Sequence, residues 1–214
     1  VICISVIIPM ERNNPSQKRS RDRLKKVVTA AKKELSENGY NALSLSRVCA
    51  VAGVKPASVY RYWPDKTAIL KSLMDEFEHT ISEQMRVRMA ENPSLEEFIS
   101  HLLSDLQYYC SYDDWIMQAL IGMGIEVNMH ERHDQSIERL TEIVTHALSS
   151  YFLFNDTDSA QRIGKSIVYI VETFLMALGR NVLLGRSNKG LRADFEDVLM
   201  NHINCRCANL RKRR

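Results

Sequence analysis

Residues 45–66 read LSRVCAVAGVKPASVYRYWPDK, and this stretch decides the fold that we expect. It predicts two short helices, over residues 45–52 and 56–63, joined by a turn at Gly53. Ser44 suits the N-cap of the first helix, and the second begins at a Pro, which is favoured at that position. Two helices joined in this way form a helix-turn-helix, whose second helix can lie in the major groove of DNA. The small core beneath them would consist of Val48, Ala52, Val54, Val59 and Trp63.

Outside this stretch, apolar residues recur at helical spacing in every long segment, and strand-like alternation is absent. The pair Asn38-Gly39 suits the end of the first helix, and Asp65 suits the start of a long one. The other expected helices cover residues 21–38, 66–92, 95–110, 113–127, 134–152, 159–184 and 191–208. We therefore expect an all-α fold of about nine helices, with an N-terminal three-helix helix-turn-helix domain and a larger C-terminal helical domain.

Charge is distributed unevenly along the chain. Residues 10–66 hold thirteen Lys and Arg against five Asp and Glu, whereas residues 67–205 hold eleven basic against twenty-one acidic residues. A basic head on an acidic body points to a nucleic-acid partner for the head alone. We expect a mobile basic arm or extension over residues 1–20, the helix-turn-helix domain over 21–66, and the C-terminal domain over 67–214.

The five cysteines are scattered, and no secretion signal is recognisable ahead of them. Reduced thiols in a cytoplasmic protein are the simplest interpretation. The spacing of His130 and His133 could place both on one helix face, but solvated histidines are the commoner case in so polar a segment. The sequence offers no catalytic constellation, and we expect no enzymatic activity, metal or cofactor.

From Val59 to Lys66 the sequence VYRYWPDK, preceded by AVAGV over residues 50–54, resembles the DNA-binding domain of the TetR family of bacterial repressors. The resemblance covers about residues 21–75. It implies a cytoplasmic homodimer that binds a partly palindromic operator and represses transcription until a small-molecule ligand releases it. One departure is Lys55, which stands where a small hydroxyl residue commonly caps the reading helix.

The resemblance and the residue chemistry together indicate a set of DNA-binding residues. Lys66 lies in the first turn of a helix, where a cation opposes the helix dipole unless an anion such as phosphate binds there. The hydroxyl groups of Tyr60 and Tyr62 would contact phosphate, although packing is the alternative for both. The predicted set is Lys55, Ala57, Ser58, Tyr60, Arg61, Tyr62 and Lys66. The basic residues of the arm would either follow the DNA backbone or simply be solvated; they are Arg12, Lys18, Arg19, Arg21 and Arg23.

The resemblance also places a ligand cavity among the central helices, where flexible Met and amphipathic aromatic residues are frequent, although ordinary core is the alternative. Its predicted lining comes from Met85, Phe98, Leu102, Tyr109, Trp115, Met117, Met123, Tyr169 and Met176. The dimer is expected to form through the last two helices, because the first of them is apolar nearly all round. Their apolar positions are Ile163, Ile167, Ile170, Val171, Phe174, Leu175, Leu178, Val182, Leu191, Phe195, Val198, Leu199 and Ile203.

Two other functional classes remain open on the sequence. One is a helical small-molecule carrier or enzyme without a DNA role, against which the charge asymmetry and the VYRYWPDK run argue. The other is a constitutive activator or nucleoid-type DNA binder that lacks a ligand.

Overall fold

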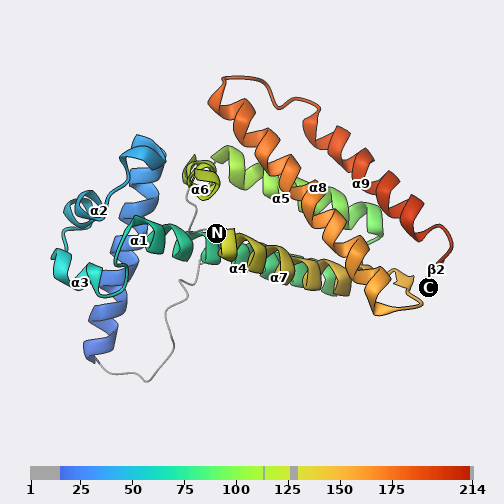
Figure 1. The fold of residues 1–214 in the computed structure, drawn as a ribbon, viewed down its shortest axis with the longest axis horizontal. Coiled ribbons are helices and arrows are strands. Elements are labelled where there is room, and N and C mark those ends of the chain that lie inside the picture. The colour runs from blue at the N-terminus through green and yellow to red at the C-terminus, as the bar shows by residue number, and fades with distance from the viewer. Residues whose placement is uncertain (1–14, 113, 126–129, 213–214) are drawn as a thin grey trace. The chain divides into compact units, whose positions relative to one another are not determined.

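The computed structural model describes residues 15–112, 114–125 and 130–212, and these ranges are almost entirely helical (Figure 1). The elements, in chain order, are α1 (Pro15–Ala42), α2 (Leu45–Ala52), α3 (Pro56–Tyr60), α4 (Lys66–Ala90), α5 (Leu95–Tyr112), α6 (Asp114–Ile125), α7 (His130–Leu148), β1 (Phe152–Leu153), α8 (Thr157–Leu183), α9 (Leu191–Cys207) and β2 (Arg211–Lys212). The all-α expectation is confirmed. None of the described helices combines the length and the apolar character needed to cross a membrane.

The first helix is longer than expected. It begins at Pro15, so residues 15–20 of the expected mobile arm are helical; a Pro start and a run of Gln, Lys and Arg are compatible with helix. The predicted stop is present, because Gly39 leaves the helical region at φ 74° and ψ 170°, and one further turn then reaches Ala42. The rest of the expected arm lies outside the described residues.

The end of the seventh helix and the strand expectation both need correction. The helix ends at Leu148 rather than at residue 152, because Phe152 and Leu153 form β1 instead. This strand pairs antiparallel with β2, with Phe152 opposite Lys212 and Leu153 opposite Arg211. A strand of two residues is too short to show an alternating pattern, so it has no recognisable pattern in the sequence.

The described chain packs as two compact units, and the division falls inside α4, between Thr80 and Ile81. The N-terminal unit holds α1, α2, α3, the first part of α4 and also α6. The second unit holds the rest of α4 with α5, α7, α8 and α9. The functional boundary expected after residue 66 stays a prediction, since a packing unit need not coincide with a functional domain.

The core of the second unit follows the apolar stripes of its helices. On α5 seven residues at helical spacing are buried, namely Leu95, Phe98, Ile99, Leu102, Leu103, Leu106 and Cys110. The helices α8 and α9 lie side by side (orange and red in Figure 1) and share an aromatic contact, with ring centroids of Phe174 and Phe195 5.2 Å apart. An ion pair of 2.8 Å between Arg88 and Asp105 joins α4 to α5.

The apolar surface of α8 divides into two faces. Four of the apolar residues that the sequence places on α8, Ile163, Ile167, Phe174 and Leu178, are buried within the chain's own second unit. Other apolar side chains remain exposed, including Tyr169 at 48% and Met176 at 44% on α8 and Val198 at 50% on α9. One apolar face of α8 therefore packs in the chain's own core, and the other apolar face remains exposed.

Candidate nucleic-acid interface

The turn between α2 and α3 is built by local capping, as the sequence predicts. The Arg47 N–H donates to Ser44 Oγ at 3.4 Å, which caps α2. Gly53 ends α2 in the left-handed region at φ 64°, where only glycine is unstrained. Lys55 precedes α3 without a side-chain capping bond, and Pro56 occupies the first turn. Proline thus starts α3 without the usual hydroxyl cap, and the Lys55 side chain is exposed.

Buried residues hold α3 against its neighbours. Val48, Val59 and Trp63 are buried as predicted, while Ala52 and Val54 are half-buried. The Trp63 indole also donates from Nε1 to Ser72 Oγ on α4 at 2.8 Å, which satisfies its polar atom.

The α3 helix is shorter than expected, with five residues from Pro56 to Tyr60. The next residues form a turn, in which the N–H groups of Tyr62 and Trp63 both donate to the Val59 carbonyl at 2.9 Å. Arg61 and Tyr62 therefore lie beyond the helix, with the Pro64 that follows unable to extend it.

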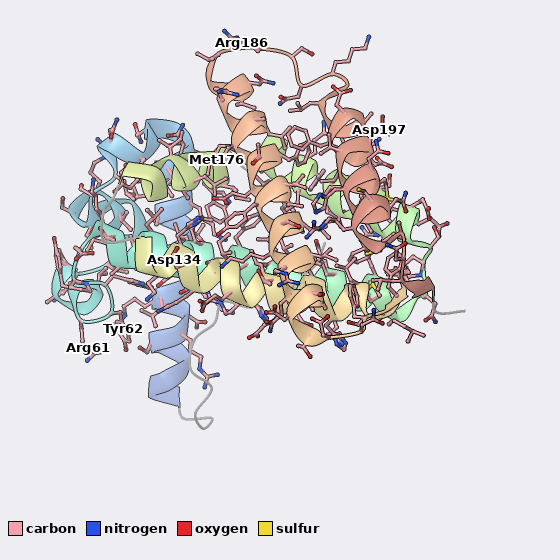
Figure 2. All side chains as sticks on the ribbon, turned by 45° about the vertical axis from the view of Figure 1, so that its right-hand side comes forward. Arg61, Tyr62, Asp134, Met176, Arg186 and Asp197 are labelled. Atoms are coloured by element: carbon pink, nitrogen blue, oxygen red, sulfur yellow. The ribbon has the colours of Figure 1, made fainter. Side chains whose placement is uncertain are left out.

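Most of the predicted DNA-binding residues form an exposed face on and around α3. Lys55, Ala57, Tyr60, Arg61 and Tyr62 are exposed, and Tyr60 and Tyr62 keep 46% and 43% of their surfaces accessible. Figure 2 shows Arg61 and Tyr62 close together beside α3. Large aromatic side chains at the surface are available for contacts outside the chain.

The Tyr62 hydroxyl lies in a polar cluster with α1. Its Oη is 3.3 Å from Ser20 Oγ and accepts a hydrogen bond of 2.9 Å from Arg61 Nη2. The Arg61 guanidinium also lies 4.9 Å from the Tyr62 ring centroid. The hydrogen bonds with Ser20 and Arg61 lower the pKa of Tyr62, because they favour its charged form. The side chain is thus held in one position with a cation beside its hydroxyl.

A second contact joins the beginning of α1 to α3. Arg23 Nη1 donates to Ser58 Oγ at 3.3 Å. The sequence indicates Arg23 only as part of a basic arm and does not indicate Ser20. No local pattern could have found either contact, because the partners lie 35 and 42 residues apart.

Lys66 begins α4 and is half-buried. Its Nζ lies 4.3 Å from the ring centroid of Tyr40, a cation–π distance. Beside it, Asp65 Oδ1 accepts the Ala68 N–H at 2.7 Å, which confirms the predicted cap of α4. A cation at the N-terminus of a long helix gives a site that favours an anion.

Two other cations of this unit are paired with buried carboxylates. Arg47 Nε donates to Glu34 Oε2 at 2.7 Å, and Lys32 Nζ lies 3.1 Å from Glu76 Oε1. Both Glu34 and Glu76 are buried. The chain's own buried carboxylates therefore partner the charges of Arg47 and Lys32.

The predicted ligand residues do not all surround one cavity. Met85, Phe98 and Leu102 border a small enclosed gap of about 10 Å³, room for about one water molecule. Gln84 borders the same gap and donates from Nε2 to Tyr109 Oη at 2.6 Å. Its own Oε1 is buried and has no hydrogen-bond partner among the residues that the structure describes.

The remaining predicted ligand residues lie elsewhere. Trp115 and Met117 are buried on α6 in the N-terminal unit, and Tyr169 and Met176 are exposed on α8. Met123 belongs to α6, but its side chain lies outside the described residues. The lining that the sequence predicts stays a prediction.

A larger groove, of about 920 Å³, lies between α4 and α7 in the second unit, and the sequence did not reveal it. Met85, Met89, Ile143 and Tyr151 are among the residues that line it, and Tyr151 Oη lies 3.6 Å from Met89 Sδ. Burial, with the nearby carboxylates of Glu97 and Glu96, raises the pKa of Tyr151. The groove results from the packing of two helices, for which a single sequence carries no local sign.

His133, one of the two histidines considered for a metal site, pairs with a carboxylate. His133 Nε2 lies 3.2 Å from Glu172 Oε1 on α8. The side chain of His130 lies outside the described residues. Within the described ranges no group of three or more His, Cys, Asp or Glu is placed to hold a metal ion.

Comparison with known proteins identifies the N-terminal part of the chain. Residues 27–73 match the family model described as bacterial regulatory proteins of the tetR family. The match takes in α2, α3 and the beginning of α4, which carry most of the exposed face described above.

Individual relatives are distant and align over part of their length. The uncharacterized HTH-type transcriptional regulator YdeS of Bacillus subtilis is 27% identical over 100 residues, 47% of this chain and 48% of YdeS. The nucleoid occlusion factor SlmA of Haemophilus influenzae is 24% identical over 142 residues, 64% of this chain and 65% of SlmA. A crystal structure of a TetR-family transcriptional regulator from Streptomyces coelicolor has the same fold, with a TM-score of 0.68 at 19% identity over 87% of this chain and 98% of that one.

Proposed function

We propose that the chain is a regulator of the TetR family, whose model its residues 27–73 match, and that it binds specific double-stranded DNA and represses transcription by occupying its operator. The observation that carries this proposal is the exposed face of α3, flanked by Lys66 and joined to the basic beginning of α1 through Arg23 and Ser20. One short helix with cations at its borders suits insertion into a major groove between two phosphate backbones.

The proposal assigns different tasks to the two ends of α3. Lys55, Ala57 and Ser58 lie at its start, the end that meets base edges in this motif. Tyr62 and Lys66 lie beyond its other end, where the tyrosine hydroxyl and the ammonium contact phosphate. Arg61 and Tyr60 lie between these groups and contact either backbone or groove edge.

The regulator acts as a homodimer, so that two reading helices meet two half-sites. Support for an interface on α8 and α9 comes from their exposed apolar side chains, among them Tyr169, Met176 and Val198. Two helices from each subunit would make a four-helix interface with two-fold symmetry.

A small-molecule ligand would release the protein from DNA, as is typical of this family. The second unit offers the gap beside Gln84, Met85 and Phe98 and the groove beside Met89 and Tyr151. Because the C-terminal part of the chain is acidic, a mostly apolar ligand that is neutral or cationic fits it better than an anion. Binding at one site and release at the other are then linked through the dimer.

A second candidate is a nucleoid-type DNA binder that needs no ligand. It is favoured by the alignment with SlmA, named a nucleoid occlusion factor, which extends over 142 residues and thus beyond the reading head. Footprinting on the same duplex with and without cell extracts separates the two, since only the ligand-responsive regulator loses its footprint when the extract contains the ligand.

Selection from a random pool of duplexes tests the proposed function. The purified chain is expected to enrich a partly palindromic sequence whose half-sites lie about one helical turn, or a multiple of it, apart. Binding of the enriched duplex should weaken steeply with salt, because each phosphate contact contributes about 0.9 to the slope of log affinity against log salt. Enrichment of no sequence, together with affinity independent of salt, would contradict the proposal and favour the carrier or enzyme.

A further inference from the structure

Two polar side chains near the beginning of α1 contact α3 and the turn that follows it. Ser20 and Arg23 lie three residues apart, so they share one face of α1, beside the buried Leu24. Arg23 Nη1 donates to Ser58 Oγ within α3 at 3.3 Å. Ser20 Oγ lies 3.3 Å from Tyr62 Oη, in the turn after α3. All of these residues belong to the N-terminal unit, and the two contacts reach different parts of the reading head.

The Arg23 guanidinium lies near a second hydroxyl group as well. The hydrogen bond with Ser20 is the largest cause that lowers the pKa of Tyr62, and the positive charge of Arg23 lowers it further. A guanidinium stays charged and carries five N–H donors, so it can act on two neighbouring hydroxyl groups at once. Arg23 therefore supplies a fixed positive charge on the α1 side of the reading head.

The hydrogen bond from Arg23 determines what Ser58 can offer to a partner. The Ser58 N–H already donates to the Lys55 carbonyl at 3.0 Å, so the hydroxyl is the group that can meet a base. A hydroxyl has one O–H donor and two acceptor lone pairs. A cationic donor on one lone pair polarises the oxygen, which makes the O–H group a stronger donor and the oxygen a weaker acceptor. With Arg23 in place, Ser58 therefore meets a base edge as a donor.

The four bases differ in how well they accept such a donor in the major groove. Guanine presents the acceptors O6 and N7 and no donor, whereas cytosine presents the N4 donor. Adenine presents one acceptor and one donor, and thymine presents one acceptor beside a methyl group. A hydroxyl donor next to a positive charge therefore fits guanine best and cytosine worst.

We propose that Arg23 is a positioning residue for base recognition, which holds the Ser58 hydroxyl as a hydrogen-bond donor and so favours guanine at one position of each half-site. This inference rests on the proposed function, in which Ser58 lies at the end of α3 that meets base edges. Arg23 then has a task different from that of a backbone contact, because it selects a base without touching one.

The affinities of four duplexes that differ at one base pair test the inference in the full-length protein. The position is the one at which Ser58→Ala loses its base preference, within the sequence enriched from the random pool. The unchanged protein should prefer guanine to cytosine there by about tenfold, and Arg23→Ala should reduce this ratio to about twofold. Arg23→Lys keeps a cationic donor and should retain most of the preference. In a Ser58→Ala background, Arg23→Ala should not change the ratio further, because the hydroxyl that it orients is absent.

Two control variants on α1 separate this role from simpler ones. Lys25→Ala removes one positive charge from an exposed position on another face of the helix and should leave the ratio unchanged. Ser20→Ala removes the contact with Tyr62, which we assign to phosphate, and should affect all four duplexes equally. The Tm of Arg23→Ala should hardly change, because a single hydrogen bond at the surface contributes little to stability.

Three results would overturn the inference. The first is an equal loss of affinity for all four duplexes in Arg23→Ala, which indicates a phosphate contact if the salt slope falls by about one unit and a structural role if the Tm falls instead. The second is a preference of the unchanged protein for cytosine at this position. The third is a Ser58→Ala variant that keeps every base preference while the unchanged chain still enriches a sequence, in which case the proposed function holds without this inference. If the chain enriches no sequence at all, the proposed function itself fails.

Discussion

Replacing Tyr169 and Met176 together by Asp is expected to convert a dimer into a monomer that stays folded. Both side chains lie on the outer face of α8, where they keep 48% and 44% of their surfaces exposed in the single chain, and Figure 2 marks Met176 on that helix. Two buried carboxylates on each subunit would oppose assembly strongly, because burial of an unpaired charge is costly. Operator affinity should fall by about 100-fold or more, because the two half-sites are then no longer bound together.

Sedimentation equilibrium and circular dichroism measure the two parts of this expectation. The matched control is Val87→Asp with Leu153→Asp, which adds the same charge at exposed apolar sites of the same unit, 53% and 43% accessible. The control should remain a dimer. A Tyr169/Met176 variant that is still a dimer at micromolar concentration would show that the subunits meet elsewhere.

Phe174→Ala is expected to have the largest effect on stability, about 3–5 kcal/mol in the free energy of unfolding. The side chain is 0% exposed, and its ring centroid lies 5.2 Å from that of Phe195, so its removal leaves a cavity between α8 and α9. Urea denaturation at one protein concentration measures the loss. Val87→Ala, at a site 53% exposed, should stay within about 0.5 kcal/mol of the unchanged protein, and a similar small loss for Phe174→Ala would contradict this packing.

The burial of Phe174 could not be predicted from the sequence alone. The apolar residues of α8 predict a buried helix, but their spacing does not say which face meets the chain's own core and which meets a partner. The sequence places Phe174 and Met176 in different sets, the first at the dimer interface and the second in the ligand cavity. The structure buries Phe174 and exposes Met176, so Phe174→Asp would report on folding rather than on assembly.

Local features were predictable because they depend on neighbours within one turn. Ser44 and Asp65 fulfil their predicted capping roles, and Gly53 forms the predicted turn, since each bonds to a backbone group within four residues. The contacts that complete the candidate site join distant parts of the chain. Ser20 and Tyr62 lie 42 residues apart, Arg23 and Ser58 lie 35 residues apart, and nothing in the sequence around any of them shows that they meet.

The most direct test of DNA reading by α3 is a titration of Lys66→Ala and Lys55→Ala against operator and scrambled duplexes at several salt concentrations. Lys66→Ala should weaken both duplexes by similar factors and lower the salt slope by about one unit, because it removes a phosphate contact. Lys55→Ala should instead change which bases are preferred, by about 1–3 kcal/mol at the affected position. A change of sequence preference in Lys66→Ala with a uniform loss in Lys55→Ala would reverse the orientation of α3, and unchanged DNA binding in both variants would contradict its role as the reading helix.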